Sequence, residues 1–160
     1  MTTIQSASSE QAEKLISLFL ADNYSGVLST TSASGRPHGA VVYYLPETDL
    51  SIHFVTKEET QKYKNIELNK QVSFVIYDEK SQTTLEIQGM VHIVEDLEKK
   101  RETLHNMTNS SIALSGKLLP PAYKLEGGDY IVLRLVPTSI NLAIYSRDKG
   151  DNVYESLQLS

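Results

Sequence analysis

Residues 35–69 read GRPHGAVVYYLPETDLSIHFVTKEETQKYKNIELN, and they carry the clearest structural signals in the chain. Within it, residues 38–45 are rich in Val and Tyr, which favour strands. In residues 50–55 apolar side chains alternate with polar ones, which is the period of a half-buried strand. Helix-forming residues follow at 57–68, and their apolar side chains are spaced to face a core. The stretch therefore predicts two strands and then a short helix.

Strand patterns continue on both sides of this stretch. Residues 24–31 and 38–45 predict a β-hairpin, because the turn-forming Ser34-Gly35-Arg36-Pro37 lies between them. Further strands are expected at residues 72–77, 84–94, 130–135 and 140–145, with Pro137 in the break between the last two. Helices are expected at residues 9–22 and 97–107, a loose tail at 1–7, and the least structure at 108–121.

No repeat or linker divides the chain, so residues 1–160 are predicted to form one domain. Its fold class is mainly β, with six or seven mostly antiparallel strands and two or three flanking helices, which suggests a closed β-barrel. The formal net charge of −5 argues against nucleic acid as a partner. The apolar runs are too short to span a membrane, and residues 1–12 lack the features of a secretory signal. The chain has no cysteine, which fits a cytoplasmic protein and excludes disulfides and thiolate metal sites.

The four histidines are the candidates for a general base or an imidazole metal site. They are His38, His53, His92 and His105. No two of them have the i, i+4 spacing of a helical metal motif, so no metal site is predicted. Each is expected to face solvent or to be hydrogen-bonded. The chain also lacks a nucleophile elbow, a P-loop and a dinucleotide fingerprint, and no catalytic side chain is assigned.

The junction between the strand ending at Val55 and the following helix has two interpretations. A helix N-terminus offers free backbone N–H groups to an anion, and Thr60 and Lys62 would add a hydroxyl and a charge. Alternatively, Thr56 and Glu59 form a T-x-x-E capping box, and Lys62 pairs with the glutamate four residues before it. The residues by themselves leave both interpretations open.

The order of these motifs resembles the pyridoxamine 5′-phosphate oxidase-like family. The resemblance rests on Gly35-Arg36-Pro37-His38, a Val/Tyr-rich strand, a strand ending in Val-Thr, then Thr60-Gln61-Lys62 and Asn69. It covers about residues 24–95. It implies a split β-barrel that binds FMN and, as is general in this family, a homodimer with the flavins at the interface. The same barrel with a deazaflavin coenzyme or haem in place of FMN is the alternative.

The resemblance also implies which residues meet the cofactor. Thr60, Gln61 and Lys62 match the family's phosphate-binding triplet, and Thr84 lies near a strand glutamine of the oxidase. The residues that would line the ring and the ribityl chain are Ala40, Val41, Val42, Tyr43, Val55 and Thr56. Ala40 and Gln61 stand where the oxidase has arginines, and His38, on the same strand face as Ala40, is the candidate to replace one lost donor.

The implied function is that of a flavin-dependent oxidoreductase acting on an unidentified small molecule. The alternative is a non-catalytic flavin-binding or stress-related module. Authentic pyridoxamine 5′-phosphate oxidase activity is not expected, because that substrate's phosphate needs a second cationic site. Leu45 stands where the oxidase has a lysine, and residues 104–115 contain no arginine.

Overall fold

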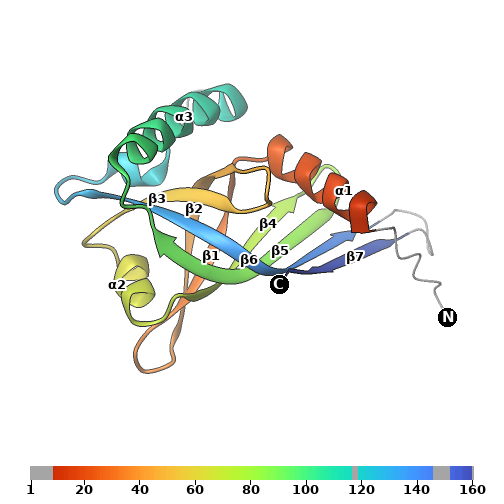
Figure 1. Ribbon diagram of the computed structural model, residues 1–160, viewed down its shortest axis with the longest axis horizontal. Helices are drawn as coiled ribbons and strands as arrows, with labels where there is room; N and C mark the ends of the chain where they lie inside the picture. The colour runs from red at the N-terminus through yellow and green to blue at the C-terminus, as the bar shows by residue number, and fades with distance from the viewer. Residues whose placement is uncertain (1–8, 117–118, 146–151, 160) are drawn as a thin grey trace.

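The computed structural model describes residues 9–116, 119–145 and 152–159, so the expected tail at residues 1–7 lies outside the described residues. Seven antiparallel strands follow the order β3-β2-β1-β4-β5-β6-β7, and β3 also pairs with β6. The first six therefore close into a barrel, which β7 extends beyond β6 (Figure 1). The strands are β1 Ser25–Thr31, β2 Pro37–Pro46, β3 Ile52–Lys57, β4 Gln71–Asp78, β5 Thr83–Ile93, β6 Tyr130–Ile144 and β7 Val153–Gln158. The helices are α1 Ser9–Asp22, α2 Gln61–Leu68, α3 Leu97–Ser115 and the 3-10 turn η1 Pro121–Lys124.

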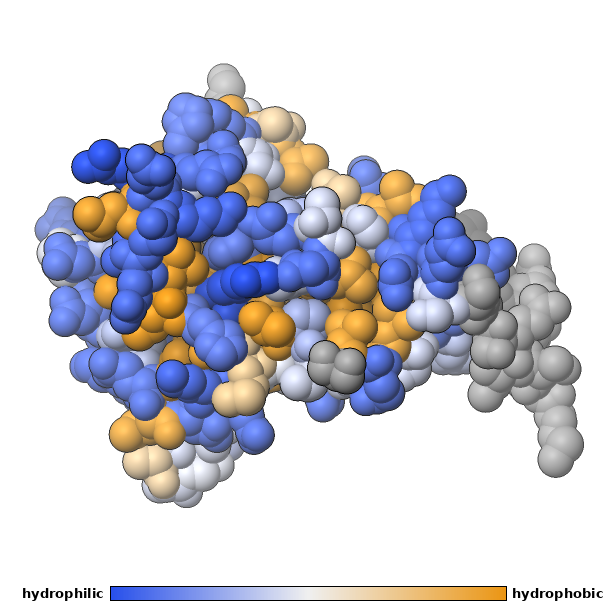
Figure 2. Space-filling view, in the orientation of Figure 1, coloured by the Kyte–Doolittle hydropathy of each residue, from blue (hydrophilic) through white to orange (hydrophobic). Residues whose placement is uncertain are grey.

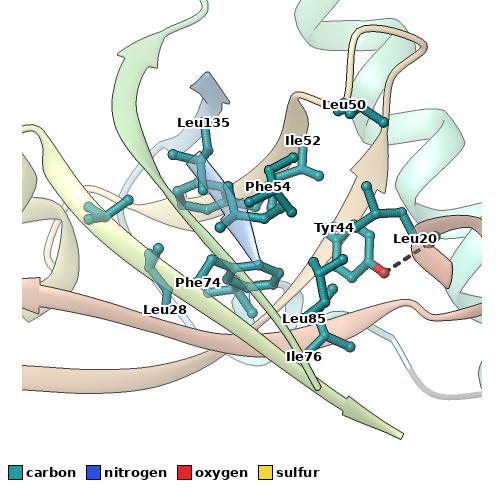
Figure 3. Packing of buried hydrophobic residues seen from close by; sticks show 14 of the residues in the cluster. Leu20, Leu28, Tyr44, Leu50, Ile52, Phe54, Phe74, Ile76, Leu85 and Leu135 are labelled. Carbon is teal, nitrogen blue, oxygen red and sulfur yellow. Dashed lines mark hydrogen bonds between the residues drawn. The ribbon is translucent and has the colours of Figure 1, made fainter. Parts of the chain in front are cut away.

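Large apolar side chains from most strands meet inside the barrel (Figure 3). Leu28, Phe54 and Phe74 are fully buried, and the rings of Tyr44 and Phe74 pack edge to face at 5.5 Å. The Tyr44 hydroxyl donates a hydrogen bond of 2.9 Å to the carbonyl of Leu20, which ties α1 to the barrel. Burial of these side chains is the main stabilising term. The predicted antiparallel barrel is confirmed.

Strand β3 differs from its expected half-buried state, because all six of its residues are buried. One face points into the barrel core. The other face forms a second cluster in which Val55 packs with Met107 of α3, Ala122 of η1 and Val132 of β6. Helix α3 thus covers the side of β3 that alternation predicted to be exposed, as its position over β3 in Figure 1 shows.

Helix α3 continues eight residues beyond the predicted end at Met107, into a segment expected to have the least structure. Thr103, Met107 and Ser111 recur at i, i+4 spacing, and all three are buried. The Ser111 hydroxyl donates to the carbonyl four residues earlier, so burial leaves it bonded. The helix ends at Gly116, whose φ of 84° suits a left-handed cap. Residues 108–115 are rich in Ser and Asn, which is why this part of the helix was not predicted.

The predicted break around Pro137 is wrong, because β6 runs unbroken from Tyr130 to Ile144. Pro137 pairs with Gly89 where the register between β5 and β6 shifts. A bulge interrupts the hydrogen-bond ladder, so a residue without an N–H is tolerated there. Strand β7, a short edge strand that pairs with the end of β6, was not predicted from the sequence.

Replacing Gly89 with alanine is expected to destabilise the barrel by about 1–3 kcal/mol, because a Cβ atom there would lie 2.1 Å from the carbonyl oxygen of Val136. Gly39→Ala is the matched control on β2, where the nearest atom to the new Cβ is 3.5 Å away. We expect it to change stability by no more than about 0.5 kcal/mol. Urea unfolding of the two variants measures the difference, and equal losses would contradict the close approach at Gly89.

Candidate functional site

The junction between β3 and α2 is built on two threonine hydroxyls. Thr56, at the end of β3, is fully buried, and its hydroxyl lies 2.9 Å from that of Thr60. Thr60 is the N-cap of α2: its Oγ1 accepts from the Tyr63 N–H at 3.4 Å and donates to the carbonyl of Lys57 at 2.8 Å. The expected Thr56–Glu59 capping box is therefore wrong, because the helix begins at Gln61 and Thr60 caps it.

Lys62 lies in the first turn of α2 and is half-buried. Among the ion pairs of the described residues, none involves Lys62, so the alternative pair with Glu58 is not formed. Burial lowers the pKa of Lys62, since its ammonium loses hydration without a compensating anion. A cation held in this way at a helix N-terminus is suited to an anionic ligand.

The β2 residues predicted to line the cofactor alternate between the two faces of the strand. Ala40 pairs with the buried Leu28 and so faces inward, as does Val42, which is 2% exposed. Val42 therefore lies in the core, and only its backbone is available to a ligand. Val41 points outward and is 54% exposed, while Tyr43, also outward, packs against the cluster that contains Val55.

His38 lies at the end of β2 that is nearest α2, opposite Thr30 of β1. Its Nδ1 atom is buried and has no hydrogen-bond partner within the described part of the protein. Buried polar atoms are rarely left without a partner, so this one fits a group that a ligand would satisfy. The position supports His38 as a donor or acceptor at the candidate site.

Thr84 is the one predicted cofactor residue that lies apart from the others. It is on β5, and two strands, β1 and β4, separate β5 from β2 in the sheet. It pairs with Tyr77, on the outer face of the barrel. The other predicted residues lie on the neighbouring strands β2 and β3, on both faces of β2, and in the first turn of α2 that follows β3, whereas two strands separate Thr84 from β2.

Three polar residues at this end of the barrel were not identified from the sequence. Asn65 and Thr30 are 1% and 2% exposed and share a hydrogen bond of 3.0 Å. Lys57 is 4% exposed; its ammonium donates to the carbonyl of Gly127 and lies 4.8 Å from the centre of the Tyr130 ring. The position of Asn65, one helical turn after Gln61, could have indicated its hydrogen bond to Gln61. No sequence pattern indicated that Lys57 is buried.

The remaining histidines lie elsewhere. His92 and His105 are exposed, whereas His53 is 4% exposed and bonded through Nδ1 to Glu47 at 3.0 Å. Lys99 of α3 contacts the same carboxylate at 3.2 Å, and these groups line a cavity of about 420 Å³. Within the described ranges, no three His, Asp or Glu side chains come together to hold a metal ion. None of the described helices has the length and apolar character needed to cross a lipid bilayer.

A closed six-stranded antiparallel barrel, with a short helix after its third strand, is the architecture of a split-barrel protein. The family model for pyridoxamine 5′-phosphate oxidase matches residues 12–142, and the chain belongs to this family. The resemblance drawn from the sequence motifs is thus confirmed. None of the curated proteins matches the chain.

Solved structures with the same fold have several named functions. General stress protein 26 from Bacillus anthracis is 24% identical, over 91% of this chain and 98% of that one, with a TM-score of 0.63. A haem storage protein from Vibrio cholerae is 21% identical, over 79% and 89%, with a TM-score of 0.60. An F420 reductase is 25% identical, over 76% and 93%, also with a TM-score of 0.60. At such low identities these structures support the fold and leave the ligand open.

Stability is expected to fall as the pH drops below about 6.5, because burial lowers the pKa of His53 in the folded protein. Lys99 and Arg134 act in the same direction, against the opposing charge of Glu47. The unfolded chain then binds a proton that the folded protein resists, until the pH passes the folded pKa. Urea unfolding between pH 7.5 and 5 measures the slope of the free energy of unfolding against pH. This slope should be smaller in His53→Gln and unchanged in His92→Gln, which replaces an exposed histidine. A slope unchanged by His53→Gln would refute this assignment.

Proposed function

We propose that this protein binds FMN and is a flavin-dependent oxidoreductase acting on a small molecule. The observation that carries the proposal is the half-buried Lys62, which has no carboxylate partner in the described part of the chain and lies in the first turn of α2. Membership of a flavin-binding family supports it. The unpartnered Nδ1 atom of His38 adds a second group that fits a polar ligand.

In this proposal the phosphate of FMN lies at the N-terminus of α2. Lys62 supplies a charge-assisted contact, and the backbone N–H groups at the start of α2 supply further donors. The outer edge of β2 at residues 40–43, together with Val55 and Thr56, would hold the ring and the ribityl chain. A bound flavin itself supplies the redox chemistry, so the protein's role is to bind, orient and exclude water. Gln61 would contribute little, since its amide is bonded to Asn65 at 2.8 Å.

The names of two related proteins indicate ligands that could compete with FMN in this proposal. One is a haem storage protein and another is an F420 reductase, so haem and a deazaflavin coenzyme are the alternatives to FMN. A stress-related role without catalysis is the alternative to an enzyme, as the name of the Bacillus anthracis protein illustrates. The absorption spectrum of the purified protein distinguishes the three ligands. Turnover of a nicotinamide cofactor with a dye acceptor distinguishes an enzyme from a binding module.

The substrate is proposed to differ from pyridoxamine 5′-phosphate. Leu45, at the position of a lysine in the oxidase, packs in the apolar cluster beneath α3. The segment at residues 104–115 has no arginine. An apolar wall next to a phosphate dianion is costly in desolvation, so an uncharged or differently shaped substrate is favoured.

Lys62→Ala is expected to weaken FMN binding by about 10- to 100-fold, because a charge-assisted contact is worth roughly 1.5–3 kcal/mol. Riboflavin, which has no phosphate, should bind the variant and the wild type almost equally. Lys64→Ala is the matched control, since Lys64 is exposed on the same helix. Fluorescence titration with both flavins measures the effect. An equal loss for FMN and riboflavin, or no loss, would remove Lys62 from the phosphate site.

A homodimer is part of the same proposal. Thr84 lies apart from the other site residues, so it would join a flavin site only through a second copy of the chain. Val27 and Val41 pair side by side on the outer face of β1 and β2, with 42% and 54% exposure, and Tyr77 on the same face is 59% exposed. Exposed apolar side chains that lie together on one face favour association. Apolar residues on the face drawn in Figure 2 lie in separate patches among polar side chains.

Light scattering of the wild type is expected to give twice the chain mass of 17.9 kDa. Val27→Lys should shift the protein toward the monomer, because it places a charge in the centre of the proposed interface. Leu18→Lys is the matched control, since Leu18 is a 54% exposed residue of α1. A wild type that binds flavin at the monomer mass would rule out the dimer.

A further inference from the structure

A relay of hydrogen bonds runs from the first turn of α2 through β1 to β2. The side-chain N–H of Gln61 donates to Asn65 Oδ1 at 2.8 Å, and Asn65 Nδ2 donates to Thr30 Oγ1 at 3.0 Å. The Thr30 hydroxyl in turn points to the carbonyl of His38, at 3.5 Å. All the donors point the same way. The relay therefore joins the turn that carries Lys62 to the residue whose Nδ1 atom lacks a partner.

The centre of the relay is buried, which makes its geometry demanding. Asn65 and Thr30 are 1% and 2% exposed. A buried amide that loses its hydrogen bonds costs free energy, so the placement of α2 that keeps both hydrogen bonds of the Asn65 side chain is favoured. The other buried side chains on this helix, Tyr63 and Ile66, make mainly apolar contacts. Apolar contacts are non-directional and tolerate small shifts of a helix along a sheet.

An asparagine in the middle of a helix is otherwise unfavourable, because it is a poor helix former. Here both polar atoms of its side chain form hydrogen bonds, one with a residue of α2 and one with a residue of β1. Asn65 lies three residues after Lys62 on α2. Its bond to Thr30 therefore restrains the rotation and the translation of α2 against the β1–β2 hairpin. A shift of about 1 Å at Lys62 is enough to weaken a charge-assisted contact.

We infer that Asn65 is the positioning residue of the anion site: through Thr30 it holds the first turn of α2, with Lys62, in register with His38 on β2. The part of this inference that concerns FMN rests on the proposed function. The part that concerns the placement of α2 does not. Gln61 belongs to the relay as its outermost donor rather than to the set of groups that contact the phosphate.

The test combines flavin titration with amide hydrogen exchange on Thr30→Val and Asn65→Leu, alone and together. Each single variant should weaken FMN binding about tenfold and riboflavin binding much less, and the double variant should be no weaker than the singles. Thr30→Ser, which keeps the hydroxyl, should restore near-wild-type affinity. Thr83→Val is the matched control: it removes another buried threonine hydroxyl, on β5, and should leave the ratio of FMN to riboflavin affinity unchanged.

Hydrogen exchange separates the two parts of the inference. Thr30→Val changes a residue outside α2, yet it should speed exchange of the α2 amides at residues 64–68, whereas Thr83→Val should not. If the wild type binds no FMN, the proposed function fails, and faster α2 exchange in Thr30→Val still supports the placement role. Unchanged α2 exchange in Thr30→Val, or additive losses of FMN affinity in the double variant, would overturn the inference.

Discussion

The pairing of β3 with two neighbouring strands closes the barrel and fixes the arrangement of the elements around it. Phe54 pairs with Tyr44 of β2 on one side and with Leu133 of β6 on the other, which closes the barrel. Because β3 has a neighbour on each edge and a packed layer on each face, every residue in it is buried. Helix α3 follows from this, since the outer face of β3 needs a cover. The strand therefore organises the barrel and its covering helix together.

The candidate site lies where this buried strand ends. The chain leaves the sheet after Lys57 and begins α2 at Gln61, so the polar groups of a strand end and a helix start meet in a confined space. There the hydroxyl of Thr56 bonds to that of Thr60 at 2.9 Å, and the amide of Asn65 bonds to the hydroxyl of Thr30 at 3.0 Å. Because Thr56, Asn65 and Thr30 are buried, these bonds hold the start of α2 in place from beneath.

Charge distinguishes this end of the barrel from the opposite end of β3. Near His53, the cations Lys99 and Arg134 are each paired with a carboxylate, and the pairs tie α3 and β6 to the turn before β3. At the α2 end, Lys57 is satisfied by a carbonyl and an aromatic ring, and Lys62 has no ion-pair partner among the described residues. In a chain of net charge −5, an unpaired and partly dehydrated cation is the feature most readily explained by an anionic ligand.

The antiparallel strands, the first helix and the family could be predicted from the sequence, because alternation, turn residues and the motifs from Gly35 to Asn69 are local signals. The sequence also placed Thr60 and Lys62 at one junction. Sequence-based prediction failed where a distant neighbour decides the outcome: the burial of both faces of β3, the passage of β6 through Pro137 opposite Gly89, and the extension of α3 from Thr108 to Ser115. Only the tertiary structure separated Thr84 from the site and joined Asn65 to Thr30, which is 35 residues away in the chain. Such contacts depend on strand order and register, and these follow from the closure of the whole barrel rather than from any local pattern.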